Sequence, residues 1–182
     1  MIRKHPFATT FRSPLEAVYL RSRSRLLREY RGIQTGFLGF DLKTKTARVY
    51  DEGKHDMDVT LLSDVGDAVA AILKHPEETA NRYVYINTFY TSQSTILTTL
   101  EKQLGKFEFS SVGAFEANAE GTARIRQGDY GGVKDSLMGM MASGADGVNG
   151  EGKDNELLLG RKTREVKELD SVIARSLQNE AA

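Results

Sequence analysis

From residue 36 onward the apolar side chains of this chain recur first with the two-residue period of a strand and then with the 3.6-residue period of a helix. That alternation is typical of an α/β fold, in which helices cover the faces of a largely parallel sheet. Residues 46–50 alternate small or apolar with polar side chains and run into Asp51-Glu52-Gly53, which predicts a strand closed by a turn. A second extended segment is predicted over residues 57–62.

A helix is predicted next, because Ser63 or Asp64 can cap its first turn and Pro76 ends the region. Its apolar side chains fall at i, i+3, i+4, i+7 and i+8, so they form one stripe that faces a core. The members of this stripe are Val65, Ala68, Val69, Ile72 and Leu73.

The run Tyr83–Ile86 joins aromatic and β-branched residues without a polar interruption, which predicts a strand covered on both faces. A second helix follows, with Thr91 or Ser92 as its cap and Gly105 as its left-handed terminator. Residues 107–109 then alternate as a strand with one solvent-facing side.

The last third of the chain is predicted to be mainly helical. Residues 114–143 have the helical period, with breaks at Gly121 and at 128–132, and a final helix places Val166, Leu169, Val172, Ile173 and Leu177 on one face. The methionine-rich stretch 137–141 is interpreted as core, with a pliable ligand pocket as the alternative. Residues 143–153 are polar and rich in glycine, which indicates a loop rather than a phosphate cradle, because no buried strand precedes the glycines.

Charge divides the chain into a basic head and an acidic body. Residues 1–31 hold eight Lys/Arg and two acidic residues, although the chain as a whole is neutral. A poorly packed extension is the favoured interpretation; a mitochondrial transit segment and a nucleic-acid-binding arm are the alternatives. No aromatic residues are spaced there to stack on bases, so nucleic acid is not an expected partner. No apolar run reaches membrane-spanning length, and we expect a soluble cytoplasmic protein without a membrane partner.

The sequence offers few residues in the spacing of a known catalytic or metal site. The absence of cysteine excludes disulfides, thiolate metal sites and a thiol nucleophile. The histidines are too far apart in sequence for the spacing of a zinc site, so no metal is expected. The Tyr-x-x-x-Lys pairs Tyr50/Lys54 and Tyr130/Lys134 lie in strand-end and glycine contexts and are interpreted as chance.

Five segments in a fixed order resemble a known family. They are Gly36-Phe37-Leu38-Gly39-Phe40-Asp41-Leu42, residues 47–53, residues 62–69, residues 75–86 and residues 100–106. This order resembles the NmrA-like, isoflavone-reductase-like family, and especially its fungal members, over roughly residues 33–180. Each segment is weak alone, and the shared order makes the resemblance specific.

The resemblance implies an atypical short-chain dehydrogenase relative with a Rossmann-type NAD(P)-binding fold. Complete members bind NADP or NAD; some reduce phenolic substrates by hydride transfer, and others are regulators that bind a transcription factor. The matching part is the C-terminal half, so residues 33–182 are predicted to form the substrate-region domain and residues 1–32 a poorly matched extension. The family's glycine-rich turn and catalytic lysine would precede residue 33 and are not matched.

That departure leads to specific expectations. We expect a truncated chain that is inactive alone and binds no cofactor, with no catalytic or cofactor-binding residue to assign. The resemblance implies a pocket for a small aromatic ligand near Phe37, Leu38 and Phe40, whose side chains would supply an apolar lining. His55, in a polar turn, is a further candidate contact. An unpaired sheet edge is expected to bind a protein partner or a second copy, and a non-catalytic regulator is the alternative function.

Overall fold

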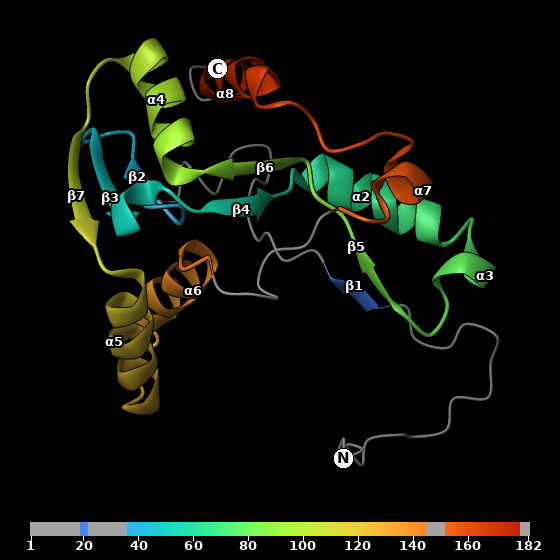
Figure 1. The fold of residues 1–182 in the computed structure, drawn as a ribbon, viewed down its shortest axis with the longest axis horizontal. Helices are drawn as coiled ribbons and strands as arrows, with labels where there is room; N and C mark the ends of the chain where they lie inside the picture. The colour runs from blue at the N-terminus through green and yellow to red at the C-terminus, as the bar shows by residue number, and fades with distance from the viewer. Residues whose placement is uncertain (1–18, 22–35, 145–151, 179–182) are drawn as a thin grey trace.

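The computed structural model describes residues 19–21, 36–144 and 152–178 (Figure 1). The strands are β1 (Tyr19–Arg21), β2 (Phe40–Asp41), β3 (Thr46–Tyr50), β4 (Asp56–Val59), β5 (Tyr83–Tyr85), β6 (Phe89–Ser92) and β7 (Glu108–Val112). The helices are α2 (Leu62–Ile72), α3 (Pro76–Thr79), α4 (Gln93–Leu104), α5 (Ala114–Arg126), α6 (Gly132–Ala142), α7 (Asn155–Leu159) and α8 (Leu169–Gln178), with short 3-10 turns η1 (Asp51–Gly53) and η2 (Val166–Glu168).

The strands pair in three small groups. β3 lies between β2, which is antiparallel to it, and β7, which is parallel. β4 and β6 are antiparallel, and β5 pairs in parallel with β1. The parallel pairs join segments far apart in the sequence, which confirms the predicted α/β class. None of the helices within the described ranges has the length and apolar character needed to cross a bilayer.

Two apolar clusters hold these groups together. The larger one packs Phe40 and Tyr50 of the first sheet against Phe89 and helices α4, α6 and α8. The smaller one joins Val84 and Ile86 to α2 and α7. In Figure 1, α4 and α8 lie on one side of the β3 sheet and the α5–α6 pair lies below it. The strands that carry the candidate site are thus held by α4 and α8 on one side and by the α5–α6 pair on the other.

Several predicted helix features are confirmed. Ser92 caps α4, because its Oγ accepts a hydrogen bond from the Thr95 amide, and Gly105 ends the helix at φ +83°. Met138 and Met141 are buried, so the methionine stretch contributes core. The face of α8 made by Leu169, Val172 and Ile173 is buried as predicted.

The predicted apolar stripe of α2 is too wide. Ala68 and Ile72 are buried, whereas Leu73 is 70% exposed and Val69 is 46% exposed. The helix packs on β5 and α7 through a narrow contact line, and these two side chains lie on its flank. Its N-cap is Leu61, and Asp64 is used in a buried ion pair instead.

Three other expectations are wrong in detail. Gly121 does not break a helix but lies inside α5, where its missing side chain lets α6 approach. Val166 belongs to the exposed turn η2 and not to the last helix. Tyr83 is 53% exposed, and among the described residues the helices α2 and α7 cover only the face of β5 that carries Val84, with Ile86 just beyond the strand.

The basic head is not wholly outside the fold. Residues Tyr19–Arg21 form β1 and pair in register with Tyr83–Tyr85. Of the glycine-rich stretch 143–153, residues 145–151 lie outside the described part of the chain.

Candidate binding pocket on the polar face of β3 and β7

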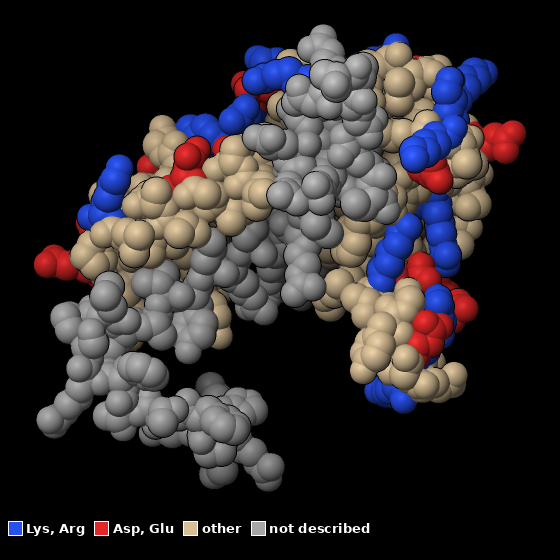
Figure 2. All heavy atoms as spheres, turned by 180° about the vertical axis from the view of Figure 1, so that it is seen from behind, with Lys and Arg blue, Asp and Glu red and all other residues tan. Residues whose placement is uncertain are grey.

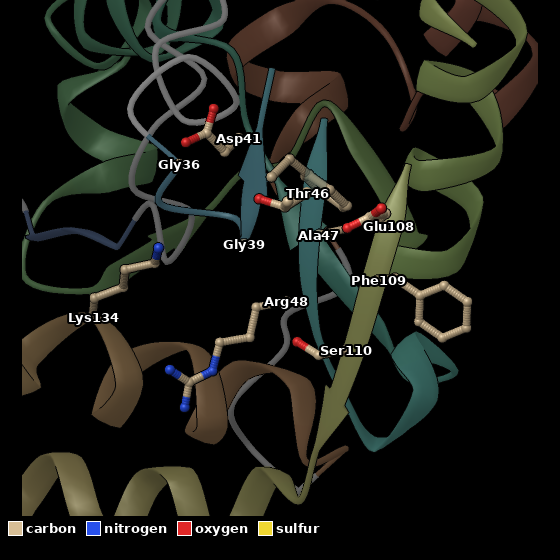
Figure 3. A pocket seen from close by; sticks show the side chains of 11 residues that line it. Gly36, Gly39, Asp41, Thr46, Ala47, Arg48, Glu108, Phe109, Ser110 and Lys134 are labelled. Carbon is tan, nitrogen blue, oxygen red and sulfur yellow. The ribbon is translucent and has the colours of Figure 1, made fainter. Parts of the chain in front are cut away.

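A pocket of about 420 Å³ lies against strands β3 and β7, with α6 on its other side (Figure 3). It is lined by Gly36, Gly39, Phe40, Asp41, Thr46, Ala47, Arg48, Glu108, Phe109, Ser110 and Lys134. Its volume lies in the range of small-molecule sites. Three of the contributing segments, around residues 40, 109 and 134, are far apart in the sequence.

Strand periodicity explains why the pocket is polar. In β3, Ala47 and Val49 face the core, so Thr46 and Arg48 point to the opposite side. The parallel register places Glu108 beside Thr46 and Ser110 beside Arg48. A row of hydroxyl and charged groups therefore covers one face of the two strands.

The loop before β2 closes one wall, and two glycines shape it. The Gly39 amide donates to the carbonyl of Gly36, and the Arg48 amide donates to the carbonyl of Gly39. A Cβ on Gly39, whose φ is +91°, would stand 2.1 Å from the Arg48 carbonyl oxygen. No side chain fits there, so glycine lets the loop lie directly against β3.

The buried side chain of Gln93 locks this loop to the strand. Its Nε2 donates to the Leu38 carbonyl at 2.8 Å, and its Oε1 accepts from the Tyr50 amide at 2.9 Å. Gln93 opens α4, so one amide group ties together the loop, the end of β3 and a helix. The pocket wall is thus set by tertiary contacts rather than by local propensity.

The end of the pocket near α6 is basic. Arg48 NH1 lies 3.4 Å from Asp135 Oδ1, while Arg48 Nε is shielded from solvent and has no hydrogen-bond partner in the described structure. Lys134 makes no hydrogen bond or ion pair with any described residue. In Figure 3, Lys134 reaches toward Gly36 and Arg48 extends from β3 toward the helices.

Asp135 is the anchor behind this basic end. Its carboxylate accepts from the Tyr50 hydroxyl at 3.2 Å and from Arg124 NH1 at 3.2 Å, in addition to the contact with Arg48. Burial and the nearby Asp135 charge raise the pKa of Tyr50 to about 12. Tyr50 is therefore a protonated structural donor at neutral pH and not an activated acid or base.

The other end of the pocket carries two carboxylates. Asp41 Oδ1 accepts from the amides of Lys43 and Thr44, and these bonds hold the pKa of Asp41 below its usual value. This carboxylate stabilises the β2–β3 turn. Glu108 lies beside Thr46 at the start of β7. The pocket is polarised, with its acidic end at the turn and its basic end at α6.

The predicted site residues occupy different places. Phe40 belongs to the pocket wall, but its side chain is fully buried in the larger core cluster together with Leu38. Phe37 is half-buried and packs on the same cluster. His55 is exposed and lies beside Gly144, where a Cβ would come within 2.7 Å of its Nδ1. Ligand contact by these four residues stays a prediction.

Arg48 and Lys134 were missed as site residues by sequence reasoning. Arg48 is a polar member of an alternating strand, a pattern that equally fits an ordinary solvent-facing residue. Lys134 falls in the Tyr130/Lys134 spacing, but the Tyr130 side chain is largely exposed. Only the packing of α6 on the sheet brings the two cations to one pocket.

A second polar cluster is structural. Asp64, nearly buried, accepts from the Thr88 hydroxyl and the Arg161 guanidinium, and Arg164 lies 3.7 Å away. Asn87 and Asn155 hydrogen-bond to each other nearby. These contacts fasten the segment after α7 onto α2 and the end of β5.

The amino-acid sequence of the chain was compared with those of known proteins. No family model matches the chain. The chain is 30% identical over 174 residues to a protein named oxidoreductase aprR from Aspergillus flavus, covering 88% of this chain and 57% of that protein. It is 27% identical over 147 residues to oxidoreductase poxI from Penicillium oxalicum, covering 78% of this chain and 46% of that protein.

A solved structure shares the fold. It is a nucleoside-diphosphate-sugar epimerase from Staphylococcus aureus, matched with a TM-score of 0.52 and 16% identity over 76% of this chain and 47% of that chain. The chain spans about half the length of the curated relatives it matches. Its fold is α/β and of the Rossmann-related type found in that epimerase, as predicted, and its sequence is similar to fungal proteins named oxidoreductases.

Proposed function

We propose that this chain supplies the substrate-binding side of an NAD(P)-linked oxidoreductase of the NmrA-like, isoflavone-reductase-like type. The pocket over β3 and β7 is its substrate site. The observation that carries this proposal is the pocket itself: a preformed cavity with donors from three segments, in a chain similar to two named oxidoreductases.

Neither the β6–α4 turn nor the β7–α5 turn fits the pyrophosphate of a pyridine dinucleotide. A pyrophosphate binds where a strand passes through a glycine-rich turn into a helix, because the free amides of the first turn point at it. At the β6–α4 turn the Ser92 hydroxyl already accepts from the Thr95 amide. At the β7–α5 turn the Glu116 carboxylate lies over Gly113, 1.8 Å from the position a Cβ would take. A carboxylate there repels a phosphate.

The proposal therefore assigns substrate recognition to these residues and nucleotide binding to none of them. Arg48, Lys134, Thr46 and Ser110 bind and orient a small molecule through hydrogen bonds and charge. Tyr50 does not transfer a proton at neutral pH, since its hydroxyl is buried and donates to Asp135. No hydride-transfer step is assigned to this part of the chain.

A non-catalytic, ligand-sensing role is the second candidate. It is favoured by the same observation about Tyr50: the pocket offers groups that hold a ligand, while the nearest buried hydroxyl is fixed in a structural hydrogen bond. Both candidates use the pocket and differ in whether bound ligand is chemically changed.

The test is a pair of titrations followed by two-dimensional ¹H–¹⁵N NMR and thermal unfolding. NADPH at a hundred times a micromolar Kd would stabilise a binding protein by about 2.7 kcal/mol, so an unchanged Tm is the expected result. A set of phenols is expected to shift amides of residues 46–50 and 108–112. Nucleotide stabilisation, or phenol shifts confined to other surfaces, would contradict the assignment.

A further inference from the structure

We infer that the basic end of the pocket, formed by Arg48 of β3 and Lys134 of α6, binds an anionic group of the ligand, a carboxylate or a phosphate. The inference rests on the pocket proposed above as the ligand site, but it needs neither a nucleotide nor turnover. It also changes the expected ligand, because the sequence pointed to an apolar lining for an aromatic molecule.

Arg48 has donor capacity that the protein does not use. Its NH1 is 3.4 Å from Asp135 Oδ1, which is a charge contact at the long end for a hydrogen bond. Its Nε is shielded from solvent and has no hydrogen-bond partner among the described residues, whereas the side chain as a whole is 42% exposed, so the terminal nitrogens of the guanidinium are the ones that a ligand can reach. A buried donor without a partner is costly, and an arginine fork matches the two oxygens of a carboxylate or phosphate.

The Asp135 carboxylate is not available to Arg48 alone. The same carboxylate is shared with Arg124 and with the Tyr50 hydroxyl, so Arg48 is one of three groups that it serves. Arg124 is further paired with Asp129 at 2.8 Å, so these two arginines and two aspartates balance in charge, and the net positive charge at this end comes from Lys134. Figure 2 shows acidic and basic side chains crowded over the α5–α6 pair, with basic ones where this pair meets the rest of the molecule.

Lys134 adds a second cation to the same side of the strands. Within the described ranges its ammonium group has neither an ion pair nor a hydrogen bond, and it lies 3.8 Å from the position of a Cβ on Gly36. Figure 3 shows Lys134 and Arg48 on the same side of β3 and β7. The hydroxyl of Ser110, in register with Arg48, supplies a neutral donor beside them.

The two carboxylates of the pocket lie toward its other end. Asp41 is held by the amides of the β2–β3 turn, and Glu108 is in register with Thr46, two residues before the Arg48–Ser110 pair. Two residues of strand separate positions by roughly 7 Å. An anionic group at Arg48 therefore stays clear of both carboxylates, which leave the acidic end for a hydrogen-bond donor on the ligand.

Three probes of similar size separate charge from aromatic character: benzoate, phenyl phosphate and benzyl alcohol. Each is titrated into the full chain at constant ionic strength while ¹H–¹⁵N NMR follows the amides of β3, β7 and α6. Saturable shifts with benzoate or phenyl phosphate, and at least tenfold weaker binding of benzyl alcohol, are expected. A stronger response to one of the two anions identifies carboxylate or phosphate as the preferred group.

Variants locate the binding group. Arg48→Gln and Lys134→Gln are each expected to weaken anion binding about tenfold or more, as loss of a charge-assisted hydrogen bond predicts. Lys106→Gln removes the same charge from an exposed lysine outside the pocket and should leave the affinity within twofold. Arg48→Lys keeps the charge but removes the fork, so an intermediate loss is expected.

Each contrary outcome overturns the inference. Equal binding of benzyl alcohol shows that the ring and not the charge is recognised, and equal weakening by Lys106→Gln shows non-specific attraction. Absence of saturable shifts up to 10-millimolar probe, roughly the weakest affinity of a useful site, also overturns it. If Arg48→Gln fails to fold, Lys134→Gln carries the test. NADPH binding would contradict the proposal that these residues bind no nucleotide, and the three-probe comparison would still decide whether the pocket recognises an anionic group.

Discussion

The Tyr50 hydroxyl donates a hydrogen bond to Asp135 Oδ1 at 3.2 Å and so ties the buried end of β3 to helix α6 across 85 residues of sequence. Tyr50 is fully buried and Asp135 is half-buried, and the Asp135 carboxylate also contacts Arg48 and Arg124. This contact fixes the distance between the strands and the helix that together form the candidate pocket. Its chemistry can be tested through pH.

Tyr50→Phe is expected to lower the free energy of unfolding by about 1 kcal/mol at neutral pH, the usual net value of one hydrogen bond. Tyr50 has a folded pKa of about 12, above the unfolded value of 10. Tyr50 therefore keeps its proton to a higher pH in the folded state than in the unfolded state. The free energy of unfolding of the wild type falls as the pH rises from about 10 to about 12.

The variant lacks this ionisation, so its stability difference from wild type should shrink over that range and then reverse, with a total change of about 2–3 kcal/mol. Urea unfolding of both proteins at pH 8 and at intervals up to pH 12 measures it. A constant difference across these pH values would show that Tyr50 ionises normally.

Gly121→Ala tests the contact between α5 and α6. A Cβ at this position would stand 2.4 Å from the Ser136 amide nitrogen and 2.5 Å from the Gly132 carbonyl oxygen, so the helices must separate. We expect a loss of about 1–3 kcal/mol in unfolding free energy. Gly66→Ala in α2 is the matched control, because it meets no atom within 4 Å and should gain about 0.5–1 kcal/mol. Similar effects of the two substitutions would refute close helix packing.

Asp64→Asn removes the charge that faces Arg161 and Arg164. Because the Asp64 side chain is only 5% exposed, the loss is expected to be about 3 kcal/mol, as for a buried pair that loses one partner. Glu156→Gln breaks the exposed 3.8 Å pair with Lys162 and should cost less than about 0.5 kcal/mol.

Limited proteolysis gives a second measurement for Asp64→Asn. The segment 160–168 should be cut faster than in wild type, since this ion pair helps to hold it against α2. Unchanged cleavage together with unchanged stability would mean that the ion pair contributes little.

Gln93→Leu leaves the Leu38 carbonyl and the Tyr50 amide without the partners that the amide side chain provides. Each buried group without a partner costs about 1–3 kcal/mol, so a loss of roughly 2–4 kcal/mol is expected. Gln103→Leu removes an exposed hydrogen bond to the Asp170 carbonyl and should change stability by no more than about 0.5 kcal/mol. Thermal unfolding of both variants measures the difference. Equal Tm values for Gln93→Leu and Gln103→Leu would show that water replaces the hydrogen bonds of Gln93.

Local sequence signals were accurate where an element depends on its own residues. The cap at Ser92, the terminating Gly105 with its positive φ and the alternation of residues 46–50 predicted α4 and β3, because capping and strand period act within a few residues. The same signals were wrong for Gly121 and for the flank of α2. Whether glycine breaks a helix or lets a second helix approach depends on what packs against it.

The amino-acid sequence by itself determined the α/β alternation, the positions of most helices and strands, and the resemblance to oxidoreductases, since all of these follow from short-range period and residue order. The tertiary structure decided which side chains share a pocket. Arg48 and Lys134 are 86 positions apart and come to one pocket only because α6 packs over β3. No local pattern encodes that proximity, because it arises from burial of Tyr50, Met138 and their neighbours in one core.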